Sequence, residues 1–543
     1  MRAKNAQASL NSTIMLIPEN TYEQNLAFQA GNNGRDWLTQ LQRGIEKEGL
    51  RVDDAGHFAM TPHPRALGSA LTNPWLTTDF SESLLEFITP VFTTINATLA
   101  YLKDTHALFY KRVTGENIWA GSMPCFLPDD DRIPVAQYGT SNRARMKTIY
   151  RIGLGHRYGR AMQTIAGVHY NFSMPEQYWQ AAFDEARTSN KTSHEEIQDF
   201  ISQRYLDLIR NFRRNYWLLI YLLGAAPCFN KSFVRGREHQ MDRLGDEDLY
   251  LPYATSLRMG DLGYQSSAQK SLFICYNELD TYIQTLREAI HKPYKPYESI
   301  GVKKNGQYRQ LNTSLLQIEN EFYSPIRPKR VTKRGQTPLR ALREHGVEYV
   351  EVRCIDVNPL TILGIDAESM RFLDTFLLYC LIKESPHCQE EEFRRNAENQ
   401  SRIVNRGRDP AIRIYCGKNE LLMRDCATDL LTDMQPIAGQ FDQAHQTSAY
   451  SDSLRQQLAK VEDDSLTPSA KILRTLIDNN QSLLAFTRKQ TLAFAKEFKS
   501  HQIKEAAERK MLADVEVSLK KQQELEQNDV VSFDEFLAAY YRQ

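Results

Sequence analysis

The chain has 543 residues, of which 41% are hydrophobic and 25% are charged. These fractions are those of an ordinary folded protein, and they exclude a disordered or fibrous chain. The 67 Lys and Arg residues balance 67 Asp and Glu residues, which argues against a protein dedicated to binding nucleic acid.

The N-terminal segment, residues 1–30, is polar and weakly patterned, and we interpret it as a flexible extension or a lead-in helix. Its apolar run spans only Ile14–Ile17. A secretory signal needs an apolar run of about 7–15 residues. The sequence therefore predicts no signal peptide, and we expect the protein in the cytoplasm.

Residues 31–390 mix the alternating pattern of strands with the longer period of helices, which predicts a domain of the α+β class. The apolar stretch 216–229 is shorter than the roughly 20 residues that a membrane helix needs, so we expect a buried helix there and no membrane partner. Residues 391–543 are patterned mainly as helices. We expect these helices to pack on the α+β domain. Within them, 500–527 is typical of a solvated amphipathic helix.

The first segment with chemical interest is 44–52, GIEKEGLRV. Side chains alternate between the two faces of a strand, so Glu46 and Glu48 point the same way. Two neighbouring carboxylates repel each other unless a cation lies between them. A solvated strand face remains the alternative.

The next segment is 78–90, TDFSESLLEFITP. Glu86 stands inside an apolar run, where a carboxylate is costly to bury without a partner. Asp79 precedes it in a turn-like stretch. Taken alone, either residue could instead be a helix cap or a member of a salt bridge.

A third strand is predicted at 167–174, GVHYNFSM. His169 shares one face with Asn171 and Ser173, while apolar side chains form the other face. A lone histidine is more often a core residue than a metal ligand, but the polar neighbours favour a functional role here.

The last of these segments is 347–359, VEYVEVRCIDVNP. Alternation places Glu351 and Arg353 on one face and Val350 and Val352 on the other. Glu351 and Arg353 could simply pair with each other. Together with the earlier segments they suggest the wall of a cavity.

If these faces line one sheet, six side chains converge, and we call them the acidic cluster. Its members are Glu46, Glu48, Asp79, Glu86, His169 and Glu351. So many carboxylates require divalent cations, and oxygen ligands favour Mg²⁺ or Mn²⁺. Because Mg²⁺ commonly combines carboxylates with substrate phosphates, the cluster points to ATP chemistry. No Walker A sequence is present, so Arg353 is the candidate phosphate contact.

The 8 cysteines contain no C-x-x-C pair. The spread is typical of a reduced enzyme and not of a disulfide framework or a zinc site. We expect these cysteines to be small buried apolar residues.

Several long stretches resemble the proteobacterial type of glutamate–cysteine ligase (γ-glutamylcysteine synthetase). They occur in the same order as in that family. The stretches are QRGIEKEGLRV at 42–52, ALGSALTNPWLTTDFSESLLEFITPV at 66–91, AQYGTSN at 136–142, RYGRAMQTIAGVHYNFSMP at 157–175, LPYATSLRMGDLGY at 251–264, LQIENEFYSPIRPKR at 316–330 and VEYVEVRCIDVNP at 347–359. The resemblance is good from about 35 to 390 and weak in the C-terminal third.

The resemblance implies a glutamine-synthetase-like fold, in which an antiparallel sheet packed with helices curves into a cup. It also implies that residues 31–390 are the catalytic domain, that the acidic cluster, Glu351 included, forms three Mg²⁺ sites, and that Arg353 contacts the transferred phosphoryl group. Arg258 and Asn171 match contacts of the glutamate substrate. A further set matches the pocket for cysteine: Phe80, Tyr150, Leu154, Gln163, Tyr264 and Tyr323.

The reaction implied by the resemblance is the first step of glutathione biosynthesis. ATP phosphorylates the γ-carboxyl of L-glutamate, and the amine of L-cysteine then displaces phosphate, giving γ-glutamylcysteine, ADP and phosphate. The resemblance also implies inhibition by glutathione, and we expect a monomer. A different carboxylate–amine ligase, a γ-glutamyl kinase and a non-catalytic binding protein on the same fold remain alternatives.

Overall fold

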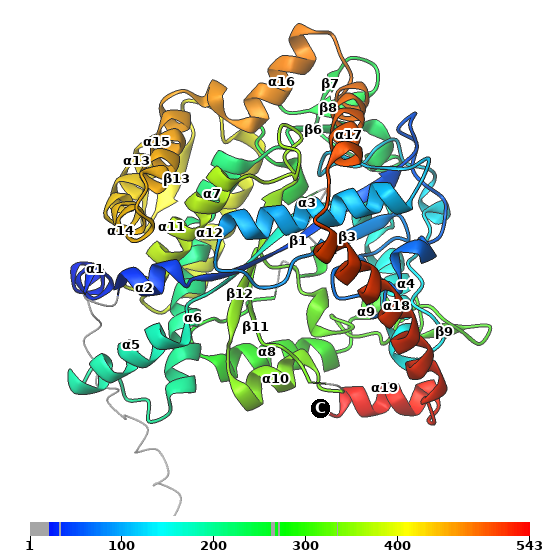
Figure 1. Cartoon of the computed structure of the whole chain (residues 1–543), viewed down its shortest axis with the longest axis horizontal. Helices are drawn as coiled ribbons and strands as arrows, with labels where there is room; N and C mark the ends of the chain where they lie inside the picture. Colours follow the sequence, from blue (N-terminus) through cyan, green and yellow to red (C-terminus); the bar gives the residue numbers. More distant parts are fainter. Residues whose placement is uncertain (1–20, 32–33, 262–266, 270–271, 334) are drawn as a thin grey trace, which may run out of the picture.

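The computed structural model describes residues 21–31, 34–261, 267–269, 272–333 and 335–543. Its centre is a seven-stranded sheet in the order β11-β12-β5-β1-β3-β2, with β4 paired to β1 (Figure 1). All of these pairings are antiparallel. The strands are β1 (Gln42–Val52), β2 (Leu76–Thr78), β3 (Leu84–Ile88), β4 (Asn117–Ile118), β5 (Gly167–Ser173), β11 (Ile326–Lys329) and β12 (Tyr349–Asp356).

The strands predicted at 44–52, 167–174 and 347–359 are confirmed as β1, β5 and β12. The segment 78–90 instead contains the end of β2, a tight turn and then β3. The backbone N–H of Asp79 donates to the carbonyl of Leu84 across this turn. The turn-like character assigned to Asp79 is therefore confirmed.

Helices cover one face of the sheet. Helix α3 begins after Thr94, whose hydroxyl accepts a hydrogen bond from the N–H of Ala97, and it packs on β1 and β3. The largest buried cluster extends from Tyr22 to Val515, so the C-terminal helices share the core of the sheet. The helices before residue 391 are α1 (Tyr22–Ala30), α2 (Gly34–Thr39), α3 (Ile95–Arg112), α4 (Asn142–Tyr158), α5 (Glu176–Thr188), α6 (Ile197–Asn215), α7 (Trp217–Leu223), α8 (Leu279–His291), α9 (Lys295–Glu298), α10 (Pro338–His345) and α11 (Ala367–Ile382).

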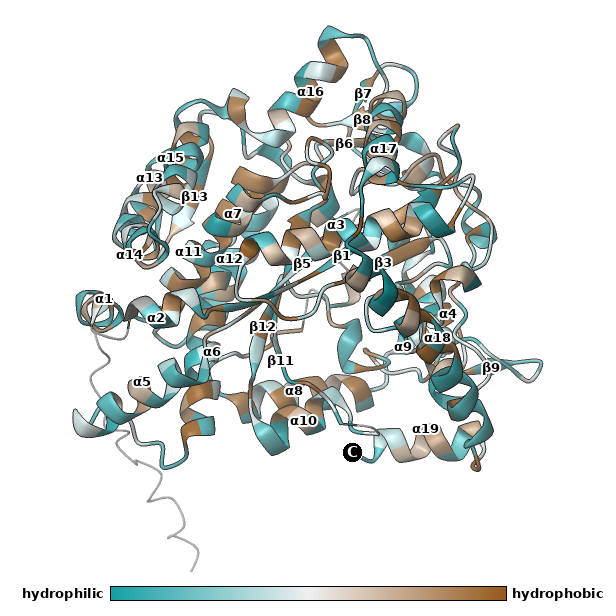
Figure 2. Ribbon diagram, viewed as in Figure 1, coloured by the Kyte–Doolittle hydropathy of each residue, from teal (hydrophilic) through white to brown (hydrophobic). Residues whose placement is uncertain are grey.

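The C-terminal region is mainly helical, as predicted, but it also contains a hairpin of β13 (Arg413–Cys416) and β14 (Asn419–Leu422). Its helices are α12 (Glu390–Arg406), α13 (Met423–Asp433), α14 (Gln435–His445), α15 (Ala449–Glu462), α16 (Pro468–Asp478), α17 (Leu483–Ser500), α18 (Glu505–Gln527) and α19 (Phe533–Tyr541). Figure 2 shows α18 as largely hydrophilic. Only Met511, Val515 and Ser518 of α18 are buried, which confirms a solvated amphipathic helix. The division at residues 30 and 390 stays a prediction.

The apolar stretch 216–229 forms a shorter helix than expected. Helix α7 ends at Leu223, and after Gly224 and Pro227 the chain enters strand β6 (Cys228–Asn230). Proline cannot continue a helix, which accounts for the early end. No helix of the described residues is long and apolar enough to cross a membrane.

The prediction that all cysteines are reduced is wrong for one pair. Cys416 ends β13 and Cys426 lies in α13, and the two form a disulfide with a Cα–Cα distance of 6.6 Å. The β13–β14 turn folds the chain back, so residues separated by 10 positions become neighbours. Spacing alone does not reveal this turn. The other cysteines are free, and most are buried.

Candidate active site

Strand β1 is the centre of the candidate site, because its register aligns the predicted ligands. Glu46 lies opposite His169 of β5, and Glu48 lies opposite Glu86 of β3. Glu351 of β12 lies opposite Asn171, one position further along the same face of β5. Residues directly opposite in antiparallel strands project from the same face, so the pairing gathers these side chains.

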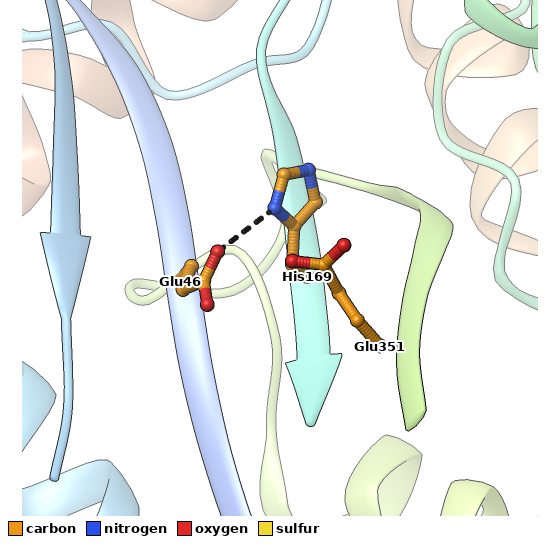
Figure 3. Close-up of side chains that lie close together, drawn as sticks. All are labelled: Glu46, His169 and Glu351. Atoms are coloured by element: carbon orange, nitrogen blue, oxygen red, sulfur yellow. Dashed lines mark hydrogen bonds and ion pairs between the residues drawn. The ribbon is translucent and has the colours of Figure 1, made fainter. Parts of the chain in front are cut away.

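Glu46, His169 and Glu351 form the tightest group (Figure 3). Each offers a ligand atom within 4.8 Å of those of the other two. Glu46 Oε2 lies 3.3 Å from His169 Nδ1. The three side chains come from three adjacent strands and point toward one another, as a cation site requires.

Glu48, Asp79 and Glu86 extend the acidic cluster along the same face. Glu48 Oε1 lies 3.6 Å from His169 Nε2, and Glu48 Oε2 accepts from the N–H of Gly167 at 2.6 Å. Asp79 comes from the β2–β3 turn. The negative charges of Glu48 and Asp79 both act on Glu86.

The electrostatics of the cluster differ between its two ends. Burial, reinforced by the charges of Glu46, Asp79 and Glu48, holds the pKa of Glu86 well above its usual value. Burial also acts on Glu351, but the cations of Lys329 and Arg353 outweigh it and hold its pKa well below the usual value. At the Glu86 end, several carboxylates therefore lie close together in a buried place, and the protonated form of Glu86 is favoured.

The donor set fits a divalent cation of the magnesium type. It is dominated by carboxylate oxygens, contains one imidazole and no sulfur, and lies at a partly buried position. Mg²⁺ and Mn²⁺ prefer oxygen ligands, and an added cation would relieve the repulsion at Glu86. The geometry thus supports the predicted ligands as one cluster.

Two lysines belong to the site, although the sequence reasoning missed them. Lys329 Nζ lies 3.1 Å from Glu351 Oε1. Lys147 of α4 lies 4.3 Å over the ring of Tyr138, and burial and Arg151 lower its pKa to about 7 although Glu86 opposes this shift. The signal for Lys329 was alternation along IRPKR, which places it on the face of β11 that adjoins Glu351.

The two predicted arginines differ in their surroundings. Arg353 Nη1 lies 3.0 Å from Glu351 Oε2, so these two residues form an ion pair. The pairing suggested by their shared strand face is confirmed, and it lies within the acidic cluster. Arg258 is 1% exposed, and its guanidinium donates to the carbonyls of Ala166 and Arg353 at 3.1 and 3.0 Å. It thus braces the start of β5 against β12.

The chain matches the family described as glutamate–cysteine ligase over residues 26–403. The chain is a member of this family. The glutamate–cysteine ligase of Azotobacter vinelandii is 47% identical over 522 residues, which cover 96% of this chain and 98% of the relative. That of Saccharophagus degradans is 50% identical over 513 residues, with coverages of 93% and 95%.

A solved structure of the same family has a similar fold. The crystal structure of glutamate–cysteine ligase from Francisella tularensis in complex with AMP is 36% identical, with a TM-score of 0.86. It covers 93% of this chain, and the chain covers 98% of it. The antiparallel α+β architecture described above is therefore that of a glutamate–cysteine ligase.

For a glutamate–cysteine ligase, the residues predicted to bind cysteine are of special interest. We call the described members of this set the acceptor pocket: Phe80, Tyr150, Leu154, Gln163 and Tyr323. Tyr264, which was predicted with them, lies outside the described residues.

The structure brings two members of the acceptor pocket into direct contact, since Gln163 Nε2 donates to the hydroxyl of Tyr323 at 3.0 Å. Tyr150 and Leu154 lie four residues apart on α4 and therefore share a helix face. Phe80 is buried, and its ring lies beside Gly155 of the same helix. The set thus combines apolar and polar side chains.

Asn171 offers a free acceptor beside the acidic cluster. Its Nδ2 donates to Glu46 Oε1 at 3.0 Å, which fixes the orientation of the amide. Its buried Oδ1 has no hydrogen-bond partner among the described residues. An oxygen in this state is suited to accept from the ammonium group of an amino-acid substrate.

Proposed function

We propose that this member of the family joins L-cysteine to the γ-carboxyl of L-glutamate at the acidic cluster, using ATP and forming ADP and phosphate. The observation that carries the proposal is the convergence of Glu46, His169 and Glu351 beside Lys329 and Arg353. Carboxylates that require metal ions, next to cations suited to phosphate, are the parts that phosphoryl transfer needs.

The acidic cluster holds Mg²⁺, and Mn²⁺ can substitute. Glu46, His169 and Glu351 would ligate one ion, and the neighbouring carboxylates, Glu48, Asp79 and Glu86, would ligate another. When bound, such ions would supply positive charge for the phosphate oxygens of ATP. The carboxylates gathered around Glu86 support this assignment, since their repulsion adds to burial in raising the pKa of Glu86 and a cation would relieve that repulsion.

Arg353 and Lys329 act on the phosphoryl group. The guanidinium of Arg353 stays charged and presents several donors in one plane, which suits the oxygens of the transferred phosphoryl group. Lys329 supplies a compact charge from the neighbouring strand. Both cations lie against Glu351, which is the place where phosphate charge would develop in this proposal.

The reaction then follows in two displacements. A γ-carboxylate oxygen of glutamate attacks the terminal phosphorus of ATP, and ADP leaves. The cysteine amine attacks the carbonyl carbon of the resulting γ-glutamyl phosphate, an amide bond forms and phosphate leaves with the bonding electrons. Arg258 and the free Oδ1 of Asn171 hold the glutamate, with Arg258 acting through the backbone of β5 and β12.

Cysteine binds in the acceptor pocket beside this site. Its partly apolar lining accepts a small side chain, and a pocket of this kind separates close analogues by only about 1–3 kcal/mol. We therefore expect 2-aminobutyrate, which is close in size to cysteine, to be accepted.

The experiment measures ADP release by the purified protein with Mg²⁺-ATP and glutamate, with and without cysteine. Strong dependence on cysteine, and loss of release when EDTA removes the metal, supports the proposal. Release that ignores cysteine would instead indicate a kinase or another acceptor amine. No release with any amino acid would indicate a non-catalytic binding protein.

Finer features belong to the same proposal. The sheet curves into the glutamine-synthetase-like cup, the protein acts in the cytoplasm as a monomer, and glutathione inhibits it. The support for these points is the family membership together with the antiparallel sheet. Size-exclusion chromatography with light scattering tests the monomer, and titration of the ADP-release assay with glutathione tests the inhibition.

A further inference from the structure

Helices α18 and α19 run along the side of the molecule that contains α4 (Figure 1). Several contacts attach this segment to the catalytic region. Ser518 Oγ of α18 accepts from the N–H of Ser69 at 3.0 Å, and Glu526 Oε1 accepts from the N–H of Thr140 at 2.9 Å. Asn142, the first residue of α4, donates to the carbonyl of Val531 at 2.9 Å. Helix α18 and the turn before α19 are therefore attached to the catalytic region, next to the start of α4.

The apolar face of α19 packs on two elements at once. Phe533 and Leu537 share a buried cluster with Met146 and Ile149 of α4, and with Leu311 and Ile318 of the loop that precedes β11. Tyr150 packs against the same cluster. Helix α4 carries Tyr150 and Leu154 of the acceptor pocket, and the loop leads to Tyr323. Helix α19 thus joins the two walls of that pocket from outside.

A hydrogen-bonded path begins at Tyr541, the last residue of α19. Its hydroxyl donates to the carbonyl of Gln317 at 2.9 Å and accepts from Asn312 Nδ2 at 2.8 Å. The buried side chain of Gln317 in turn donates to the carbonyl of Tyr150 at 3.1 Å. Tyr541 is therefore connected to the backbone of Tyr150 through a single intermediate residue.

The same path continues to Tyr323. The N–H of Gln317 donates to Glu321 Oε2 at 2.8 Å. Gln269 Nε2 donates to the carbonyl of Glu321 at 2.9 Å, and Gln269 Oε1 accepts from the N–H of Tyr323 at 3.0 Å. Gln163 then binds the hydroxyl of Tyr323. Because these groups are mostly buried, each bond restricts its neighbours.

We infer that Tyr541 is a positioning residue for the acceptor amino acid: by fixing Gln317, it sets the spacing between Tyr150 and Tyr323. The inference rests on the proposed function, because the assignment of these tyrosines to cysteine is part of that proposal. The acidic cluster is held instead by strands β1, β3, β5 and β12 and by the β2–β3 turn. Loss of the Tyr541 hydroxyl therefore weakens cysteine binding more than it affects phosphoryl transfer.

The test compares Tyr541→Phe with wild type in steady-state kinetics for each substrate. Loss of the two neutral hydrogen bonds is expected to raise KM for cysteine about threefold to tenfold. Both kcat and KM for glutamate and ATP should change less than about twofold. The preference for cysteine over 2-aminobutyrate should also fall, because a looser pocket distinguishes them less well.

The matched control is Tyr221→Phe, which removes a hydroxyl that donates to the carbonyl of Lys460 at 2.9 Å between α7 and α15. It should leave KM for cysteine unchanged. The inference is overturned if Tyr541→Phe leaves KM for cysteine unchanged, or if all kinetic constants decline together with the melting temperature, which would indicate a general structural role.

Tyr323→Phe separates this inference from the proposed function. A raised KM for cysteine in Tyr323→Phe without a change in Tyr541→Phe overturns only the role of α19. Unchanged values in both variants overturn the assignment of the pocket as well. A change in Tyr541→Phe alone supports the positioning role and moves the acceptor contact from Tyr323 to Tyr150.

Discussion

The two faces of strand β1 both bury ionisable side chains, but they treat them in opposite ways. On the face covered by helices, Arg43 pairs with Asp374 of α11 at 2.8 Å, and Lys47 Nζ lies 2.9 Å from His106 Nε2 of α3. On the other face, Glu46 and Glu48 meet further acidic residues of the cluster. Successive residues of one strand thus belong to different environments.

On the covered face, the buried charges of Arg43 and Asp374 are paired within the protein. Asp374 accepts from Arg43 and also from the hydroxyl of Tyr170 at 2.6 Å, so the buried pair has its hydrogen bonds within the protein. The face with the acidic cluster gathers carboxylates that repel one another, and this repulsion adds to burial in raising the pKa of Glu86. A buried ion pair whose charges are matched within the protein needs no ligand, whereas a group of buried carboxylates with shifted pKa values indicates a site for a ligand.

Arg43→Met tests the covered face and should have the largest effect. It leaves Asp374 buried without its cation, which costs about 3–5 kcal/mol of unfolding free energy. Urea unfolding measures this loss, and the kinetic constants of the folded enzyme should stay as in wild type. The double variant with Asp374→Asn should recover much of the stability. If Arg43→Met alone were as stable as wild type, the pairing of Arg43 with Asp374 would not matter for stability, and the comparison of the two faces would be wrong.

Glu351→Gln tests the other face. Loss of one charged ligand should lower kcat for cysteine-dependent ADP release by about 100-fold to 1000-fold, while thermal stability without metal is retained. Glu82→Gln is the matched control, since Glu82 is also buried but accepts from the N–H of His63 outside the cluster. If Glu351→Gln kept a tenth of the activity, its role as a metal ligand would be wrong.

Lys329→Met addresses the cations beside the cluster. Removal of the charge 3.1 Å from Glu351 should raise KM for ATP about 10-fold. It should also tighten Mg²⁺ binding without nucleotide, measured by titration calorimetry, because Glu351 loses a competing cation. Lys333→Met, at an exposed position in the following loop, should change neither quantity. Weaker Mg²⁺ binding in Lys329→Met would contradict the assigned role.

Lys47→Met gives the smallest effect and depends on pH. Burial lowers the pKa of Lys47 from 10.5 to about 7, so above pH 7 the unfolded chain binds a proton that the folded protein does not. The contribution of Lys47 to the free energy of unfolding therefore rises with pH between about 7 and 10.5, and it is lost below pH 7. Urea unfolding of wild type at pH 7 and 8 should differ by about 1 kcal/mol from this cause, and Lys47→Met should lose that difference. An identical pH dependence in the variant would show that Lys47 is charged when folded.

The alternation of side chains allowed much of the acidic cluster to be predicted from the sequence. Glu46, Glu48, His169 and Glu351 lie on regular strands, where a period of two fixes the face. The order of strands was not available from this pattern, because pairing between β1, β5 and β12 joins segments far apart in the chain. The family resemblance supplied the convergence that periodicity could not.

Other features depended on tertiary contacts, which a local pattern such as the alternation around Lys329 does not fix by itself. Lys329 gained its role from the pairing of β11 with β12, and Lys147 from the approach of α4 to the cluster. The Cys416–Cys426 disulfide depends on the fold of the β13–β14 hairpin. The role of α19 was equally hidden, since its sequence shows an amphipathic helix but not which surface it covers.

The strand order also has a consequence for synthesis of the chain. In the sheet, only β5 separates β12 from β1. The ribosome, however, makes β12 about 300 residues after β1. At the usual pace of translation, roughly 15–60 s separate the two. During that interval Glu46 and Glu48 emerge without Glu351 and without the cations that accompany it. A nascent chain that still lacks β12 therefore lacks part of the site proposed to capture metal and nucleotide.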